Sequence, residues 1–418
     1  MKKGLAVVVL AAGKGTRMKS SLPKVLHPLC GRPMLDYVLD TAKALKPQHL
    51  IVVLGFGHQQ VRPFISAGID VVVQKKLCGT ADAVKEALAL LKGFSGSLLV
   101  LYADTPLLRV ETVKKLIGYH KANNLAATLL SANLDKPQGY GRILRDAYSA
   151  VCGIVEERDA SEYQKKIKEI NSGIICFDVE RLREVIFKIR PDNRKGEYYL
   201  TDAISLLYKK EYVIDCVKVD DANEVLGINS RLELAKAVRF IQQRINEQHM
   251  RKGVTLVDPS SIFIDWGVKI GADTVIYPFT VIESGVKIGK GCSVGPFARL
   301  RRGTSLKDNC QVGNFIEIVR STLFSKSKAK HFGYLGDSLI GRQVNIGAGT
   351  VTANYDGQKK HKTRIGDNSF IGSDTVLVAP VVIGRGAKTG AGCVVTKNTK
   401  VGDNSVVVGV PARLLRKG

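Results

Sequence analysis

Two different spacings of apolar residues divide the 418-residue chain. From Lys3 to about Asp221, short apolar runs alternate with segments in which apolar residues recur every three or four positions. Short runs of this kind are typical of buried parallel strands, and the segments between them are typical of helices. The expected strands are 5–10, 50–54, 71–73 and 98–102, and the expected helices are 34–45, 81–91 and 110–120. This half of the chain is therefore predicted to be an α/β domain with a mostly parallel sheet.

Residues 231–250 predict one long amphipathic helix, about 30 Å in length. Its apolar face consists of Leu232, Leu234, Ala237, Val238, Ile241 and Ile245. We expect a linker helix over 227–252 between a first domain, 1–226, and a second domain, 253–418.

Beyond this helix the period of the apolar residues becomes six. Aliphatic side chains recur without a miss at Ile264, Ile270, Ile276, Ile282, Ile288, Val294, Leu300, Leu306, Val312 and Ile318. A hexapeptide repeat places one aliphatic residue at each corner of a triangular coil, and each coil buries these residues only by stacking on its neighbours. The second domain is therefore predicted to be a parallel β-helix.

The six-residue period shifts twice, between residues 318 and 340 and between residues 352 and 365, and then holds to Val407. We expect a bulge or loop at each shift, because a shift forces residues out of the regular coil. Loops on a rigid scaffold commonly carry function. The residues of chemical interest in these loops are His331 in the first, and Asn354, Tyr355 and Lys360 in the second.

A glycine-rich loop, LAAGKGTRMKSSLPK over residues 10–24, follows the first expected strand. Its glycines let the backbone approach a ligand closely, and Arg17 and Lys24 can neutralise phosphates. The position after the first strand of an α/β sheet is where such folds bind nucleotides. Neither a Walker loop nor a dinucleotide fingerprint matches, since Met18 stands where the latter needs a third glycine. The loop is thus a phosphate-binding loop of another kind, or an ordinary turn with surface cations.

Asp104 stands at the carboxyl end of the expected strand 98–102. A single carboxylate at this position either caps the next helix or holds Mg²⁺. Magnesium in nucleotide sites commonly takes only one or two protein ligands together with substrate phosphates.

The chain carries 63 Lys and Arg against 38 Asp and Glu, a net charge of +25. This charge predicts anionic partners. Because no recognition-helix pattern, aromatic RNA platform or zinc-finger spacing accompanies it, we favour phosphorylated small molecules over nucleic acid. No segment is long enough to insert into a membrane. The eight cysteines contain no CxxC, which is typical of reduced thiols, so we expect a cytoplasmic protein.

The loop resembles the LxAGxGTR…PK signature of sugar-1-phosphate nucleotidyltransferases. More of the chain resembles the family of bacterial bifunctional N-acetylglucosamine-1-phosphate uridylyltransferases / glucosamine-1-phosphate acetyltransferases. The segments that carry this resemblance are GYGRI at 139–143, IVE at 154–156, EINSG at 169–173, GEYYLTD at 196–202, GINSR at 227–231 and the hexapeptides. The resemblance implies a Rossmann-like nucleotidyltransferase domain followed by a left-handed parallel β-helix that assembles as a homotrimer.

For the first domain the resemblance implies transfer of UMP from UTP to N-acetylglucosamine-1-phosphate, with release of pyrophosphate. It implies catalytic roles on the phosphates for Arg17 and Lys24, and Mg²⁺ ligands at Asp104 and Asn229. The implied nucleotide contacts are Leu10, Ala11, Ala12, Gly13, Lys24, Gln74, Gly79 and Thr80. The implied sugar-side contacts are Tyr102, Ala103, Gly141, Glu156 and Asn171, of which Ala103 stands where the family usually has glycine.

For the second domain the resemblance implies acetyl transfer from acetyl-CoA to the amine of glucosamine-1-phosphate, with His331 as general base. The implied substrate contacts are Arg301, Tyr334, Asn345 and Lys360. The implied acetyl-CoA contacts are Ala348, Asn354, Tyr355, Ser373 and Ala391. Two positions depart from the family pattern: Val319 replaces a lysine that helps bind the sugar phosphate, and Gly409 replaces a late arginine.

Two alternatives remain open. The chain could be a sugar-1-phosphate nucleotidyltransferase whose β-helix is weakly active or inactive and serves as a trimerisation scaffold. It could also be a non-catalytic regulatory subunit, which should have lost its phosphate cations or metal carboxylate. Arg17, Lys24, Asp104 and Asn229 are all present, which argues against the second alternative.

Overall fold

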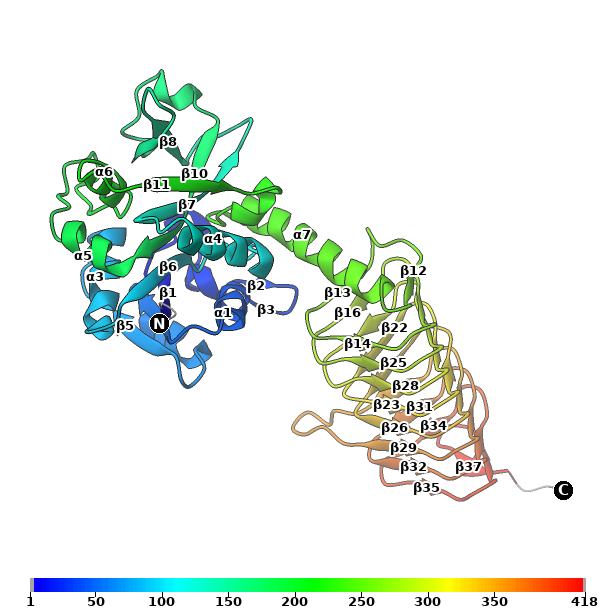
Figure 1. The fold of residues 1–418 in the computed structure, drawn as a ribbon. Coiled ribbons are helices and arrows are strands. Elements are labelled where there is room, and N and C mark those ends of the chain that lie inside the picture. The colour runs from blue at the N-terminus through cyan, green and yellow to red at the C-terminus, as the bar shows by residue number, and fades with distance from the viewer. Residues whose placement is uncertain (1–3, 416–418) are drawn as a thin grey trace. The chain divides into compact units, whose positions relative to one another are not determined.

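The computed structural model describes residues 4–415, so the outermost residues of both expected domains, 1–3 and 416–418, lie outside the described residues (Figure 1). The chain divides into two compact units, Met1–Ala237 and Val238–Gly418. The boundaries at 226 and 253 stay a prediction.

The first unit contains a nine-stranded sheet. Its strands are β1 (Gly4–Ala11), β4 (His49–Leu54), β5 (Asp70–Val73), β6 (Gly96–Tyr102), β7 (Ala127–Asn133), β8 (Gly141–Arg145), β9 (Val151–Val155), β10 (Glu169–Asp178) and β11 (Ile214–Lys218). The main order is β11-β7-β10-β6-β1-β4-β5, and β8 pairs with β9 and β10. β1 is parallel to β4 and β6, whereas β10 is antiparallel to β6 and β7. The prediction of a mostly parallel sheet is confirmed.

Helices cover both faces of this sheet (Figure 1). They are α1 (Met34–Ala44), α2 (His58–Val61), α3 (Thr80–Leu88), α4 (Val110–Ala122), α5 (Val179–Ile186) and α6 (Asp202–Tyr208). Short elements complete the unit: 3-10 turns η1 (Thr16–Met18), η2 (Lys24–Leu26), η3 (Arg62–Phe64), η4 (Ala89–Leu91), η5 (Gln164–Lys166) and η6 (Ala222–Val225), and the hairpin β2 (Pro28–Leu29) with β3 (Arg32–Pro33). Alternate residues of β1 enter two separate cores, one with α3, α5 and α6 and one with α1 and α4. Burial on both faces explains why β1 is apolar throughout.

The second unit is a stack of triangular coils whose short strands form three sheets (Figure 1). These strands are parallel except for β37, which is antiparallel to β36. Sheet 1 contains β12 (Thr255–Leu256), β15 (Val275–Ile276), β18 (Ser293–Val294), β21 (Gln311–Val312), β24 (Lys328–Ala329), β27 (Asn345–Ile346), β30 (Phe370–Ile371), β33 (Lys388–Thr389), β36 (Val406–Val408) and β37 (Arg413–Leu414). Sheet 2 contains β13 (Phe263–Ile264), β16 (Val281–Ile282), β19 (Arg299–Leu300), β22 (Ile316–Val319), β25 (Gly333–Gly336), β28 (Val351–Ala353), β31 (Val376–Val378) and β34 (Val394–Val395). Sheet 3 contains β14 (Lys269–Ile270), β17 (Lys287–Ile288), β20 (Ser305–Leu306), β23 (Thr322–Leu323), β26 (Ser338–Ile340), β29 (Thr363–Ile365), β32 (Val381–Ile383) and β35 (Lys400–Val401). The predicted left-handed parallel β-helix fold is confirmed.

The expectation that residues leave the coil as a bulge or loop at the first shift is wrong. Leu323, Ala329 and Leu335 are fully buried and continue the aliphatic core, with one residue removed at each of two corners. Paired strands are therefore 17 residues apart here, as in Leu306↔Leu323, instead of the 18 of Ile282↔Leu300. Two shortened corners change the phase as a loop would, so His331 lies in an ordinary coil.

The second shift is a projecting segment, as expected. Residues 354–362 leave the coil between β28 and β29 and fold into a short hairpin closed by the bridge Tyr355↔Lys360 (Figure 1, in orange). The extra residues lengthen the coil, so Ser338 pairs with Thr363, 25 residues further on.

The expected long helix is α7 (Arg231–Met250). Ala237, Ile241 and Ile245 are buried as predicted, but Leu232 is 77% exposed, so the apolar face begins later than expected. Two buried polar residues were not predicted to matter. Gln242 donates to the carbonyl oxygen of Ile264, and Asn246 donates to those of Pro259 and Ile262. These amides satisfy backbone acceptors at the start of the β-helix.

Among residues 4–415, no helix is both long and apolar enough to cross a membrane.

Candidate functional sites

The glycine-rich loop meets two remote segments through Lys24, which begins η2. The Lys24 ammonium donates to the Asp104 carboxylate and, over 2.9 Å, to Oδ1 of Asn229. Gly15 allows this approach, because a Cβ there would lie 2.7 Å from Cβ of Lys24, and its φ of +61° also favours glycine. Gly13 faces open space and Arg17 is exposed, so both remain accessible to a ligand.

The oxygens of Asp104 and Asn229 converge on one cationic nitrogen, which is the arrangement that a divalent cation needs. Within residues 4–415 no group of three or more His, Cys, Asp and Glu side chains could hold a metal. One carboxylate and one amide oxygen suit Mg²⁺, provided that substrate phosphates complete its coordination. The two predicted metal ligands therefore fit a metal that arrives with a nucleotide.

GINSR, at 227–231, is held against the loop by contacts that sequence reasoning missed. The backbone N–H of Ile228 donates to the Asp104 carbonyl, and that of Asn229 donates to Glu233 over 2.6 Å. The Arg231 guanidinium donates to the Met18 carbonyl over 3.2 Å. These bonds fix the Asn229 side chain beside the loop.

The predicted uracil-side residues cluster at the start of α3. Gln74 is buried, and its Nε2 donates to the Gly79 carbonyl over 3.0 Å and to Asp82 over 2.7 Å. Both N–H groups are thereby used, so the amide oxygen is the group left for a ligand. Thr80 accepts from the Leu200 N–H, and Gly79 lies so close to Tyr198 that a Cβ would sit 2.5 Å from its carbonyl oxygen.

The predicted sugar-side residues lie where β8, β9 and β10 meet. Asn171 pairs with Gly141, and a Cβ on Gly141 would lie 3.5 Å from both carboxylate oxygens of Glu156. Burial raises the pKa of Glu156, and Thr201 donates to its carboxylate over 3.2 Å.

Burial also raises the pKa of the Tyr102 hydroxyl, whose ring packs against Gly173. Ala103 is buried, and its N–H donates to the Leu10 carbonyl.

In the second unit, one group of predicted residues lies on sheet 2. Arg301 donates to Glu317 over 2.7 Å, and Glu317 pairs with Tyr334 in the ladder of β22 and β25. The Tyr334 hydroxyl accepts from Asn354 at 3.5 Å. His331 is exposed and precedes Tyr334 on the same coil. These side chains can face one substrate.

A second group stacks along the corner between sheets 1 and 2. The carbonyl oxygens of Phe332, Ala348 and Ser373 accept the N–H groups of Gly349, Asp374 and Gly392, each in the next coil. Ala348, Ser373 and Ala391 thus form a column of small side chains that begins below His331. A narrow thioester chain could lie along this column.

The remaining residues lie outside these two groups. The pKa of Asp337, which accepts from Asn354, is lowered mainly by the Arg320 guanidinium and in part by Lys360, so Lys360 lies near the first group. Asn345 lies on sheet 1, around the corner from Tyr334, whereas Tyr355 and Lys360 lie on the projecting hairpin. The single chain therefore places the predicted acetyl-transfer residues on two faces and a hairpin.

The structure places both residues that depart from the family pattern, Val319 and Gly409, in defined backbone environments. Val319 is only 3% exposed, and the next residue, Arg320, adopts φ of +47° in the shortened corner. The Arg320 guanidinium then forms a bidentate ion pair with Asp337, at 2.7 and 2.8 Å. Gly409 has φ of +87° in the turn between β36 and β37, where an arginine would be strained.

A column of exposed phenylalanines along the corner between sheets 1 and 2 was missed by sequence reasoning, although its spacing of 18, 18 and 17 residues could have revealed it. Phe279 and Phe297 stack with ring centroids 4.8 Å apart, and Phe297 and Phe315 with centroids 5.1 Å apart. Phe279, Phe297, Phe315 and Phe332 are 55%, 46%, 60% and 55% exposed. Exposed apolar groups in a continuous row are typical of a protein interface.

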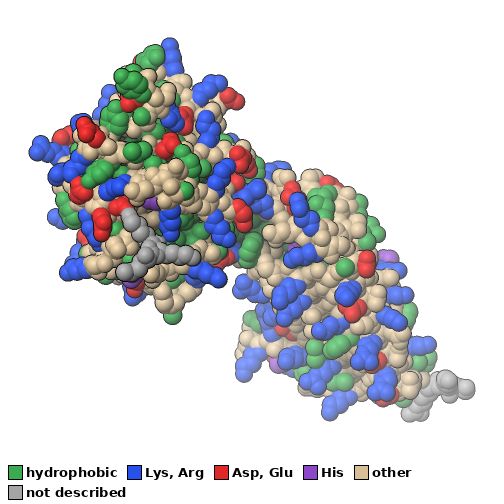
Figure 2. All heavy atoms as spheres, in the orientation of Figure 1, with side chains coloured by type: hydrophobic (Ala, Val, Ile, Leu, Met, Phe, Trp, Pro, Cys, Tyr) green, Lys and Arg blue, Asp and Glu red, His purple; other side chains and the backbone are tan. Residues whose placement is uncertain are grey.

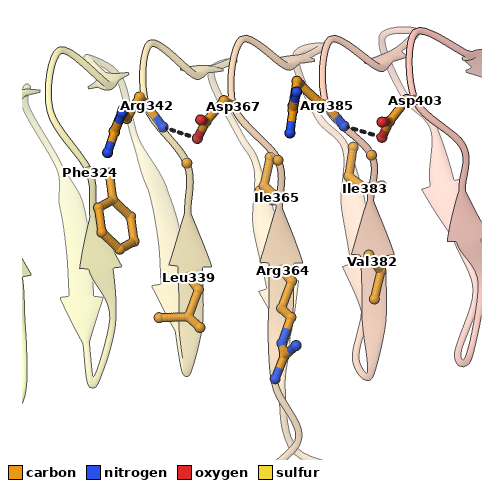
Figure 3. A pocket seen from close by; sticks show the side chains of 13 residues that line it. Phe324, Leu339, Arg342, Arg364, Ile365, Asp367, Val382, Ile383, Arg385 and Asp403 are labelled. Atoms are coloured by element: carbon orange, nitrogen blue, oxygen red, sulfur yellow. Dashed lines mark hydrogen bonds between the residues drawn. The ribbon is translucent and has the colours of Figure 1, made fainter.

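A groove of about 690 Å³ lies on sheet 3 and contains none of the predicted residues (Figure 3). Leu339 and Val382 line it beside Arg342 and Arg385, and the acids Asp367 and Asp403 cap the backbone N–H groups of those arginines at 2.7 Å. The visible face of this unit carries many Lys and Arg side chains (Figure 2).

Together, the fold and these sites define a nucleotidyltransferase joined to a hexapeptide-repeat acyltransferase. Residues 7–167 match the MobA-like NTP transferase domain, and residues 267–302 and 362–397 match the bacterial transferase hexapeptide.

The chain is similar to curated proteins over nearly its whole length. It is 45% identical over 412 residues to "Bifunctional protein GlmU" of Pelotomaculum thermopropionicum, covering 90% of each chain. It is 42% identical to the protein of the same name from Geobacillus sp., covering 93% of this chain and 92% of the relative. The chain belongs to the GlmU family of bifunctional proteins and is an enzyme with uridylyltransferase and acetyltransferase activities. The resemblance stated from the sequence is confirmed.

Proposed function

We propose that the chain acetylates glucosamine-1-phosphate with acetyl-CoA and then transfers UMP from UTP to the N-acetylglucosamine-1-phosphate formed. The observation that carries the first unit's role is the convergence of Lys24, Asp104 and Asn229 at the glycine-rich loop. This arrangement provides a phosphate cation and two oxygen ligands for a metal at one point.

In uridylyl transfer, a phosphate oxygen of the sugar phosphate attacks the α-phosphorus of UTP. A P–O bond forms there as the bond between the α-phosphorus and its bridging oxygen breaks, and pyrophosphate leaves. The chain needs no covalent nucleophile, because positioning and charge neutralisation carry most of the catalysis. Arg17 and Lys24 neutralise the phosphates, the Gln74 amide oxygen accepts from the uracil ring, and Glu156 and Asn171 orient the sugar.

We propose Mg²⁺ as the metal, held by Asp104 and Asn229. When bound, it supplies positive charge to the phosphate oxygens and offsets the charge that develops on them. Lys24 occupies the meeting point of the two ligands, so we expect its ammonium to move onto a phosphate when substrate arrives.

In acetyl transfer, His331 accepts a proton from the glucosamine amine as the nitrogen attacks the thioester carbon. An N–C bond forms, the C–S bond breaks, and CoA leaves as its thiolate. Arg301, Tyr334, Asn345 and Lys360 bind the sugar phosphate. The column of Ala348, Ser373 and Ala391 lies alongside acetyl-CoA, with Asn354 and Tyr355 at its edge.

We propose that the chain acts as a homotrimer in the cytoplasm, where UTP and acetyl-CoA are available. The exposed row of Phe279, Phe297, Phe315 and Phe332 supports an assembly through the β-helix, because burying it removes apolar rings from water. The division of the acetyl-transfer residues between two faces supports a site that adjacent copies complete.

The test measures both activities in the same preparations. One assay supplies UTP, Mg²⁺ and N-acetylglucosamine-1-phosphate, and the other supplies acetyl-CoA and glucosamine-1-phosphate. Asp104→Ala should abolish most uridylyl transfer and leave acetyl transfer nearly intact. His331→Ala should lower acetyl-transfer turnover by about 10²–10⁴ and spare uridylyl transfer.

A parallel loss of both activities in a folded variant would contradict separate sites. A wild-type chain with uridylyl transfer but no acetyl transfer would leave the β-helix as a scaffold.

A further inference from the structure

Arg142, a residue to which no role has been given above, has a fully buried side chain in the first unit. Its side chain is 1% exposed. The guanidinium donates to the Tyr140 carbonyl, to the Glu157 carboxylate over 2.7 Å and to the Lys165 carbonyl over 3.4 Å. Removing a guanidinium from water costs several kcal/mol unless partners of this kind compensate for it. A buried cation that donates to three separate acceptors joins the segments that carry those acceptors.

Two of the three acceptors adjoin sugar-side residues, and the third, Lys165, lies in η5. Tyr140 immediately precedes Gly141, and Glu157 immediately follows Glu156. Arg142 itself lies on β8 opposite Ile170, so its neighbour Gly141 lies opposite Asn171 on β10. The guanidinium therefore holds the turn after β9 and the start of β8 at one separation.

That separation decides how the sugar-side groups face one another. A Cβ on Gly141 would lie 3.5 Å from both Glu156 carboxylate oxygens, which is an ordinary contact distance, so Gly141 and Glu156 are direct neighbours across β8 and β9. β8 and β9 are joined to the rest of the sheet only at Ile170 and Asn171 among the strand pairs of the described residues. The other restraints on this hairpin come from side chains: Ile143 and Val151 pack into the core with α6, and Arg145 pairs with Glu169 on β10.

We infer that Arg142 is a positioning residue for the acetamido sugar. Its hydrogen bonds hold Glu156 and Gly141 beside Asn171. This inference rests on the proposed uridylyl transfer. A planar fork with five N–H groups reaches three acceptors at once, which an ammonium cannot do with the same geometry.

The test compares Arg142→Met, Arg142→Lys and Glu157→Gln with a matched control, Arg145→Met. Arg145 lies on the same strand, and its partly exposed guanidinium pairs with Glu169 at 3.1 Å, away from Glu156. Each variant is assayed for KM of N-acetylglucosamine-1-phosphate, KM of UTP and kcat of uridylyl transfer. Acetyl transfer in the same preparation reports on the integrity of the second unit, and near-ultraviolet circular dichroism reports on the first.

Arg142→Met should raise KM of the sugar phosphate about 10- to 100-fold, because it removes charge-assisted hydrogen bonds that hold the sugar-side residues in place. KM of UTP should stay within about twofold of wild type, because UTP is bound by other segments. Arg142→Lys should recover part of the loss, Glu157→Gln should shift the same KM in the same direction, and Arg145→Met should resemble wild type.

Equal increases in both KM values, or unchanged kinetics with only a lower melting temperature, would overturn the positioning role. If Arg142→Met fails to fold, Glu157→Gln decides, since an unchanged sugar KM in that variant would also overturn it. A wild-type chain without uridylyl transfer would instead refute the proposed function, and the two failures are therefore distinguishable.

Discussion

Lys24 occupies the point where Asp104 and Asn229 would hold a divalent cation, and we predict that it competes with the metal in the absence of nucleotide. The contacts are well shielded, because the side chains of Lys24 and Asp104 are only 11% and 19% exposed. The perturbation is Lys24→Met, which removes the ammonium and keeps a long unbranched side chain. With the ammonium gone, a divalent cation no longer has to displace it.

The ammonium makes two hydrogen bonds, to Asp104 and to Asn229, and the expected size is calculated for the loss of one of them. A hydrogen bond to a charged group contributes about 1.5–3 kcal/mol net. Since about 1.4 kcal/mol corresponds to a factor of ten, losing one such competing interaction should tighten metal binding roughly 10- to 150-fold. The same change should weaken UTP binding, because a phosphate loses its cation.

The assay is titration of the nucleotide-free protein with Mn²⁺, followed by electron paramagnetic resonance, which detects the free ion without any turnover. Lys14→Met is the matched control, since Lys14 is an exposed lysine of the same loop. It should bind Mn²⁺ as wild type does. Equal Mn²⁺ affinities for wild type and Lys24→Met would refute the competition and would mean that the two oxygens do not form the metal site.

Three further predictions concern stability and assembly. Burial raises the pKa of Asp202 from 3.8 to about 6, so its protonated form stabilises the fold below about pH 4 and this contribution is lost as the pH rises through about 6. The melting temperature of Asp202→Asn, relative to wild type, should therefore rise between pH 4 and pH 7, and a constant difference would contradict this. Leu300→Ala, at a fully buried corner of the β-helix, should lower the free energy of unfolding by about 3–5 kcal/mol in chemical denaturation, and a loss below about 1 kcal/mol would count against a tightly packed coil. Light scattering at micromolar concentration should give three times the 45.5 kDa chain mass, and a single-chain mass would exclude the homotrimer.

Most residues of the candidate sites could be predicted from the sequence, but the contacts that those residues make could not. Lys24, Asp104 and Asn229 were predicted from their motifs, yet nothing in the motifs shows that one ammonium joins the other two side chains. Arg142 was visible only as part of GYGRI, and its burial depends on β9, η5 and β10 closing around it. Motifs specify side-chain types, whereas contacts across many residues depend on the order in which strands pair.

The sequence by itself determined both architectures. A coil must bury an aliphatic residue at each corner, so a six-residue period indicates a stacked triangular helix, and short Val-rich apolar runs between helical segments indicate strands covered on both faces. Only the tertiary structure showed that the first shift is two shortened corners, which leave Leu323 and Leu335 buried and place Arg320 against Asp337. The spacing of apolar residues shows which side chains are buried, and this spacing depends only on residues close together in the sequence. Which remote groups then face one another depends on how whole coils and strands stack, which no local pattern contains.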